Sequence, residues 1–234
     1  MSRTGDLILQ HLSTVSAERG ARAADQVLAM RVTQVKVYQQ ARFALTYADL
    51  LAHSRYAGAS KFFLDDLYGP DDFSERDAQF ARVVPALVRL FPSEVAETVE
   101  ALTCLHALSE QLDTEMGRHI DGEPVRATGY VDAWRLTGRP SSRQRQIELM
   151  VEVGRALDVY TRRPVLRHSL HLMRVPARAA GLSALQAFLE SGFDTFRSMH
   201  GANDFLAQIA ARERALAAML FDPAMSVQLL GRLP

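Results

Sequence analysis

The chain has 234 residues, of which 48% are hydrophobic and 23% charged, the balance of an ordinary globular protein. Its 27 Lys and Arg equal its 27 Asp and Glu, and a formal net charge of zero argues against a protein that coats nucleic acid. Its single cysteine excludes an intrachain disulfide and a zinc site built from several thiolates. The longest apolar run, residues 215–221, is too short to cross a membrane, so we expect a cytoplasmic protein without a membrane partner.

Helical periodicity runs along nearly the whole chain, and strand patterns are almost absent. The first long helix is predicted over residues 22–53, which contain no Pro and no Gly. It carries two stripes, one mixed (with Gln39 and Arg42 among apolar residues) and one mainly apolar, which is typical of a helix central in a bundle. Further helices are predicted over 59–68, from N-cap Ser74 to 91, over 93–116 and 125–137, from 141 or 142 to about 161, up to Pro176, over 183–200 behind a capping box at Ser183, and over 203–221.

These elements predict one all-α domain over residues 1–234, a multi-helix bundle of about eight or nine helices. No low-complexity linker divides the chain into halves, and no fixed repeat period indicates a solenoid.

The most distinctive segment is FFLDDLYGP over residues 62–70, followed by DFSERD over 72–77. It resembles an uncharacterised bacterial family named for its "FFLEELY" motif, with Asp65 and Asp66 in place of the two glutamates. The last third is also similar to that family, at residues 192–193, 201–206 and 212–213. The resemblance implies a helical bacterial protein, and it carries over no catalytic residue.

This segment has two readings. Asp65 and Asp66 lie late in a predicted helix, where the helix dipole disfavours anions, so we expect a cationic partner such as Arg76 or Arg82. In the first reading, Asp–Arg pairs hold a helix–turn–helix corner. In the second, the corner is the rim of a pocket that holds a ligand or partner through four residues: Asp66, Tyr68, Arg76 and Asp77.

Histidines and carboxylates at helical spacing offer an alternative metal site. His106 and Glu110 are four residues apart on one predicted helix, and His168 and His171 are three apart on another. The chain has no Glu-x-x-His, the pair that helical di-iron proteins use, so the spacing alone supports this site. We therefore expect no cofactor, and we keep a metal at these four residues, or a haem on one of the seven histidines, as the alternative.

The zero net charge is a sum of two opposed segments. Residues 65–100 contain nine acidic residues and three Arg, which gives −6, and residues 135–178 contain ten Arg and three acidic residues, which gives +7. The two segments could pair inside the fold or across a dimer, or form an anion-binding or protein-docking surface. We do not expect nucleic acid as a partner, because the basic segment lacks lysine and has few aromatic residues.

Two functions from different classes remain. The first is a non-enzymatic interaction or regulatory module of a bacterial cytoplasm, which binds a protein partner or self-associates through the apolar stripes of residues 22–53. The alternative is a helical bundle that binds a small ligand, a metal or a haem in its core, and that could be an enzyme. A buried polar cavity reached by the candidate His and Glu side chains would favour the alternative.

Overall fold

A computed structural model describes residues 2–67, 73–121, 124–224, 228 and 230–234 of the chain. The regular structure of these residues is helical throughout, which confirms the predicted all-α class. A π-helical turn at Phe63–Leu67 and a short 3₁₀ helix at Leu230–Arg232 accompany the α-helices. The α-helices are α1 (Arg3–Ala23), α2 (Gln26–Thr46), α3 (Ala48–Ala52), α4 (Ala57–Phe62), α5 (Ser74–Leu90), α6 (Ser93–His119), α7 (Ala127–Thr137), α8 (Pro140–Thr161), α9 (Pro164–Leu172), α10 (Arg174–Ala179), α11 (Ser183–Ser198) and α12 (Asn203–Phe221).

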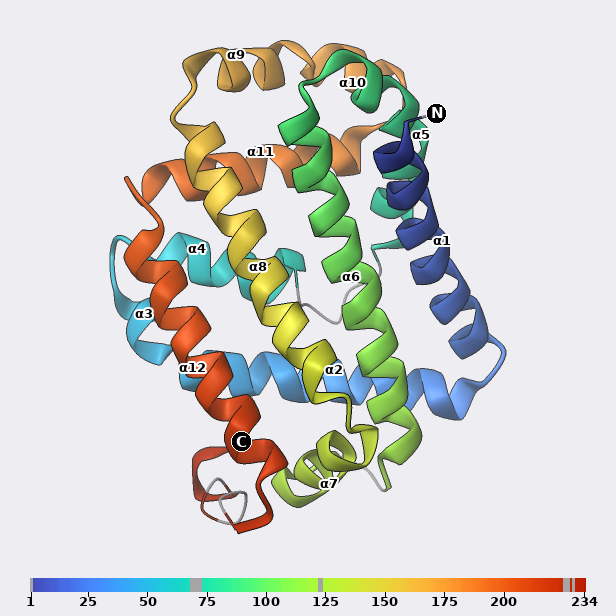
Figure 1. The fold of residues 1–234 in the computed structure, drawn as a ribbon, viewed down its shortest axis with the longest axis vertical. Helices are drawn as coiled ribbons and strands as arrows, with labels where there is room; N and C mark the ends of the chain where they lie inside the picture. The colour runs from blue at the N-terminus through green and yellow to red at the C-terminus, as the bar shows by residue number, and fades with distance from the viewer. Residues whose placement is uncertain (1, 68–72, 122–123, 225–227, 229) are drawn as a thin grey trace.

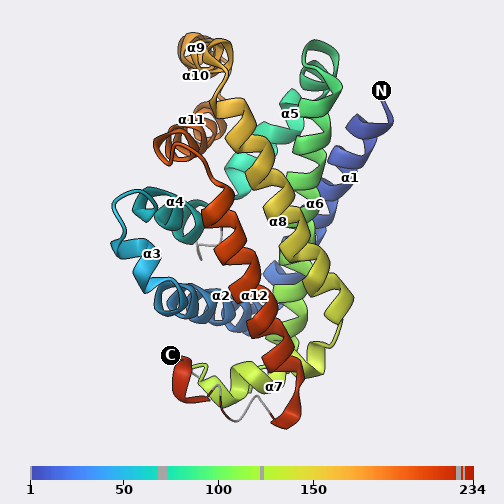
Figure 2. The ribbon, with the colours of Figure 1, turned by 60° about the vertical axis from the view of Figure 1, so that its left-hand side comes forward.

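The helices form two crossed layers. In the first layer α1, α6, α8 and α12 lie side by side along the long axis of the molecule (Figure 1). Behind them α2 and α11 run across this direction, and α4 lies between α2 and α11 (Figures 1 and 2). Since α6 packs against α1, α2, α7 and α8, its side chains reach the interior from several directions. No described helix combines the length and the apolarity needed to cross a membrane.

The helices are more numerous than the eight or nine expected, because two predicted helices are divided and because α1 was not predicted, so that residues 22–23 end α1 rather than begin the next helix. The helix predicted over 22–53 is interrupted at Tyr47, whose backbone leaves the helical region (φ −116°, ψ 23°) while its side chain is fully buried. The segment before Pro176 forms two helices, α9 and α10. Two predicted N-caps are also wrong, because Ser74 and Ser183 are the first residues of α5 and α11 and neither helix has a side-chain cap.

The segment that carries the family resemblance packs against the last third of the chain. The Phe62 ring stacks on Phe188, with ring centroids 5.7 Å apart, and the Phe63 ring contacts Phe205 at 5.8 Å. A Cβ on Gly192 would meet the Phe62 ring at 3.0 Å, so only glycine fits there without a shift. Residues 62–63 and 192–206 therefore form one part of the core, although they are distant in sequence.

Only one of the two stripes of α2 is buried. Val32, Val35 and Arg42 face the interior, and Gln39 on the same stripe contacts buried groups there. The apolar stripe is largely exposed, with exposed fractions of 44–53% at four residues: Val27, Met30, Val37 and Leu45. The more polar stripe is buried because it meets charged groups of the interior.

Candidate functional site

A network of charged side chains lies between α1, α2, α5 and α6. At its centre, the Glu110 carboxylate of α6 is only 3% exposed and accepts hydrogen bonds from Arg22 at 2.5 Å and from Lys36 at 2.8 Å. Arg19 lies 3.4 Å away on the same carboxylate. Burial alone would raise the pKa of Glu110, but the charges and hydrogen bonds of Lys36 and Arg22 lower it to about 2. Glu110 is therefore held ionised by the cations around it.

A carboxylate–imidazole pair forms the outer end of this network. The Nε2 of His106 lies 2.8 Å from Oδ2 of Asp77, and Arg19 Nη1 lies 2.9 Å from the same oxygen. Burial opposes the charge on Asp77, but the hydrogen bond and charge of His106, together with Arg19 and Arg76, lower its pKa overall. All four side chains remain partly accessible, with exposed fractions between 12% and 19%. The pair could therefore contact a bound molecule.

Arg76 is a cation held between aromatic rings. Its guanidinium lies 4.1 Å from the ring centre of Phe73 and 4.4 Å from that of Phe188. Its Nη1 donates a 2.8 Å hydrogen bond to the backbone carbonyl of Asp66, and its Nε lies 3.6 Å from Asp77. Burial lowers the pKa of Arg76 despite the nearby carboxylates. Among the described residues, Arg76 pairs with one carboxylate, that of Asp77, which it shares with Arg19 and His106.

These polar groups border a partly open cavity of about 50 Å³, which we call the Arg76 pocket. Its polar lining residues are Arg76, Asp77, Thr103, His106 and Ser109. The remaining lining is apolar and comes from α1, η1, α5, α6, α8 and α11, with Phe63, Phe80, Leu102, Leu105 and Phe188 among its residues. An apolar wall with a few polar groups is the usual composition of a small-molecule site.

The structure joins parts of the two candidate sites. Arg76 and Asp77, from the predicted pocket rim, share one network with His106 and Glu110, from the predicted metal set. Asp66 lies half-buried beside them and contributes its backbone carbonyl, and burial and Asp65 raise its pKa. Tyr68 lies outside the described residues.

The second half of the metal set lies elsewhere. His168 is exposed and His171 is half-buried, and both belong to α9 at one end of the molecule (Figure 1). His106, Glu110, His168 and His171 therefore do not converge on one point.

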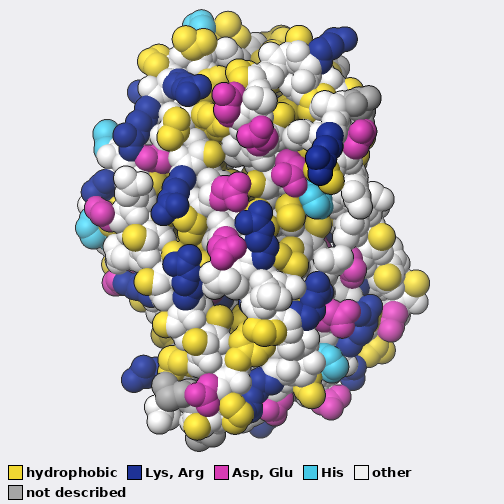
Figure 3. All heavy atoms as spheres, viewed as in Figure 1, with side chains coloured by type: hydrophobic (Ala, Val, Ile, Leu, Met, Phe, Trp, Pro, Cys, Tyr) yellow, Lys and Arg dark blue, Asp and Glu magenta, His cyan; other side chains and the backbone are white. Residues whose placement is uncertain are grey.

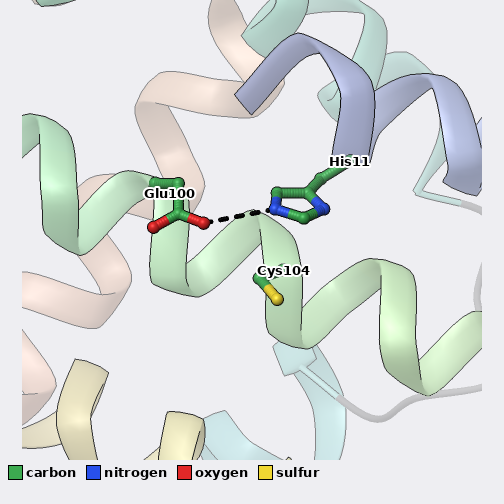
Figure 4. Close-up of side chains that lie close together, drawn as sticks. All are labelled: His11, Glu100 and Cys104. Carbon is green, nitrogen blue, oxygen red and sulfur yellow. Dashed lines mark hydrogen bonds and ion pairs between the residues drawn. The ribbon is translucent and has the colours of Figure 1, made fainter. Parts of the chain in front are cut away.

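A different group of possible metal ligands lies between α1 and α6. His11 Nε2 is 3.2 Å from Glu100, and Cys104 lies one turn further along α6, with all three ligand atoms within 4.8 Å of one another (Figure 4). A tetrahedral zinc ion would need these atoms about 3.4–3.6 Å apart, and the His11–Glu100 contact of 3.2 Å is slightly shorter than that. The His11–Glu100 ion pair and burial of the Cys104 thiol, which raises its pKa, account for the cluster as it stands.

Four of the ten arginines of the basic segment pair with carboxylates of that segment or of α11. Arg145 lies near Glu148 and Glu152, and Arg162 binds Asp158. Arg167 and Arg174 pair with two acidic residues of α11, Asp194 and Glu190. Acidic and basic side chains are accordingly interspersed on the face shown in Figure 3.

The sequence of residues 18–226 matches the family model "Domain of unknown function (DUF8198)". The chain belongs to this family. Its description names neither an activity nor the FFLEELY motif, so membership assigns no site residue. No curated protein and no solved structure matches the chain.

Sequence reasoning missed the cations of α1 and α2 that complete the network. In α1, the buried residues Ile8, Leu12 and Val15 continue at the same helical spacing into Arg19 and Arg22. This spacing was the available signal, because an arginine that continues a buried stripe needs an anionic partner.

Proposed function

We propose that this protein is a small-molecule-binding helical domain, and that its ligand is a small organic anion with an apolar part. The Arg76 pocket would hold the apolar part against its aromatic and leucine side chains. Arg76 and His106 would face the anionic group, with Asp77 orienting the imidazole.

One observation carries the proposal: Arg76 is a largely buried, ring-stacked cation at the edge of an apolar cavity, and among the described residues it pairs with one carboxylate, Asp77, which it shares with Arg19 and His106. An anion beside it would supply a second negative partner. The ion pairs of the network support this sign of charge, because among the described residues four cations (Arg19, Arg22, Lys36 and Arg76) pair with two carboxylates (Asp77 and Glu110).

A direct test compares matched ligands and matched variants by calorimetry and thermal shift. We expect propionate or butyrate to bind more tightly than the uncharged propionamide or butyramide. Arg76→Gln should weaken carboxylate binding at least tenfold, because a charge-assisted contact is lost. Arg82→Gln is the control, since Arg82 lies on the same helix but donates to the backbone of Ala180 and does not line the pocket.

Two results would contradict the proposal. One is equal binding of the acids and their amides, and the other is an equal loss of affinity in Arg76→Gln and Arg82→Gln. Thermal unfolding of both ligand-free variants separates lost binding from lost stability.

A second candidate function, self-association as an interaction module, is supported by the exposed row on α2. Val27, Met30, Val37 and Leu45 recur at helical spacing, carry no charge and are about half exposed. An uncharged apolar row can pack against the same row of a second copy. We expect concentration-dependent dimers in sedimentation experiments that Val37→Glu abolishes.

The control for this candidate is Val165→Glu on α9, where the valine is 73% exposed but lies outside the row. A protein that stays monomeric at all concentrations, or dimers that survive Val37→Glu, would contradict self-association through α2.

A further inference from the structure

A second cavity lies at the other end of the polar interior, where α2, α7, α8 and α12 meet. Its volume is about 60 Å³, and Met150 is the lining residue that it shares with the Arg76 pocket. Its polar lining comes from Gln39, Arg42, Tyr130, Trp134, Arg143, Gln146 and Glu213. We call it the Trp134 cavity.

Three hydrogen-bond donors on its lining residues have no partner among the residues that the structure describes. These are the Tyr130 hydroxyl, the Trp134 indole N–H and the Arg42 Nε–H. Their side chains are at least nine-tenths buried, with exposed fractions of 0%, 7% and 8%. Among the described residues, six buried side-chain N or O atoms lack a partner, so half of them belong to this one cavity. Because leaving a buried donor unpaired is costly, their concentration at one place indicates an acceptor that completes them.

The Tyr130 hydroxyl lies among four charged groups. Burial raises the pKa of Tyr130, Glu213 and Asp113 raise it further, and Arg42 and Arg143 lower it. The hydroxyl therefore stays protonated and available as a donor.

The charged lining residues of this cavity are two arginines and one glutamate. Arg42 is paired with Glu213 at 2.5 Å, and Glu213 also accepts from Tyr47. Burial raises the pKa of Asp113, which favours its neutral form. Arg143 stacks on the Trp134 ring at 3.8 Å and donates to the sulfur of Met116 and to the Gln146 side chain. Cationic side chains therefore outnumber anionic ones on the lining of the cavity.

We infer that the Trp134 cavity is a binding site for a small monocarboxylate, whose oxygens accept hydrogen bonds from Tyr130, Trp134 and Arg42. A water needs about 10–15 Å³ of such space, so the cavity fits a ligand of about four to six heavy atoms. The site is independent of the proposed function, because it uses other donors and another cavity.

The chain offers a built-in reporter, since Trp134 is its only tryptophan. We would titrate acetate, propionate and lactate into the protein at fixed ionic strength and follow the Trp134 emission. Two compounds serve as controls: acetamide is an uncharged analogue of acetate, and phosphate is a larger anion. We expect a saturable change for at least one monocarboxylate, with a dissociation constant below about 10 mM, and tighter binding than for acetamide or phosphate.

Tyr130→Phe removes one donor and keeps the ring, so it should weaken binding about five- to tenfold. Tyr38→Phe is the matched control, because Tyr38 stacks on Tyr130 at 4.5 Å but donates to the backbone of Pro234 and does not line the cavity. If no monocarboxylate gives a saturable change, or if acetamide or phosphate binds as tightly, water fills the cavity or its ligand is of another class, and the inference is overturned. These titrations use the wild-type protein, so they test the inference even if Tyr130→Phe does not fold.

Discussion

Glu110 is the carboxylate on which the cations of α1 and α2 converge, so its neutralisation tests the whole network. In Glu110→Gln, Arg22 and Lys36 keep their buried positions but lose their counter-ion. The pKa of Glu110 is about 2 in the folded protein, against an ordinary value of 4.5. This difference corresponds to about 3 kcal/mol of stability at pH 7. It agrees with the cost of about 3–5 kcal/mol for removing one partner of a buried ion pair.

The loss of stability in Glu110→Gln should also depend on pH, which provides a second test. A carboxylate whose folded pKa is depressed contributes stability that is fully present above its unfolded pKa and is lost as the pH falls through its folded pKa. The difference between wild type and Glu110→Gln should therefore be constant above about pH 5.5, fall to about 2 kcal/mol at pH 3.5 and vanish below about pH 2.

Urea unfolding at pH 7, 5.5 and 3.5 measures this difference, and the thermal midpoint at pH 7 should fall by about 6–12 °C. Glu115→Gln is the control on the same helix, because its pair with Arg118 is exposed and should contribute less than about 1 kcal/mol. A loss below 1 kcal/mol in Glu110→Gln, or a loss that does not decline at pH 3.5, would refute the reasoning.

Two further predictions concern packing and thiol chemistry. Gly117→Ala should lower the free energy of unfolding in urea by about 1–3 kcal/mol, because its new Cβ would lie 2.5 Å from a Val32 methyl group where α2 crosses α6. Gly20→Ala is the control and should be neutral or slightly stabilising, because a Cβ there would have no atom of another described segment within 4 Å. The alkylation rate of Cys104 should have its pH midpoint above the ordinary thiol value, because burial raises its pKa and lowers the thiolate fraction at pH 7–8. Rapid modification of native protein at pH 7 would contradict that assignment.

The sequence predicts helices best where the chain carries explicit end signals. The helices expected at 125–137 and 203–221 are found at Ala127–Thr137 and Asn203–Phe221, each ending beside a Gly or an Asp-Pro. No Gly, Pro or capping residue marks the break between α2 and α3 at Tyr47. The break places the Tyr47 ring in the core, where its hydroxyl donates a hydrogen bond to Glu213 of α12. Contacts between distant helices set this boundary, and local propensity contains no information on them.

Only parts of the candidate site could be predicted from the sequence, because contacts between distant helices assemble it. Helical spacing correctly places His106 and Glu110 on one side of α6, but it does not say which helices face that side. Asp77 comes from α5, and Arg19 from α1, and they reach His106 because all three helices pack together. The two hypotheses that the sequence kept apart, a corner pocket and a His–Glu pair, meet in space at Asp77.

The residues that carry the family resemblance mainly hold distant parts of the chain together, whereas the residues of the candidate site line a cavity. Phe62 packs on Gly192, and Arg212 and Glu213 bind Asp49 and Arg42, so these positions join the first quarter of the chain to the last. They explain how the sequence specifies a fold, because each contact closes a long loop and fixes one helix against another.

The two cavities, by contrast, lie where buried polar groups remain incompletely satisfied after these contacts have formed. Arg76 shares its paired carboxylate with Arg19 and His106, and among the described residues the Tyr130 hydroxyl and the Trp134 indole N–H have no hydrogen-bond partner. A fold that needed these groups only for stability would gain from apolar residues of similar size at the same positions. Their position on the walls of cavities therefore favours binding as the reason for their polarity, and the titrations with Arg76→Gln and Tyr130→Phe test this at each end of the interior.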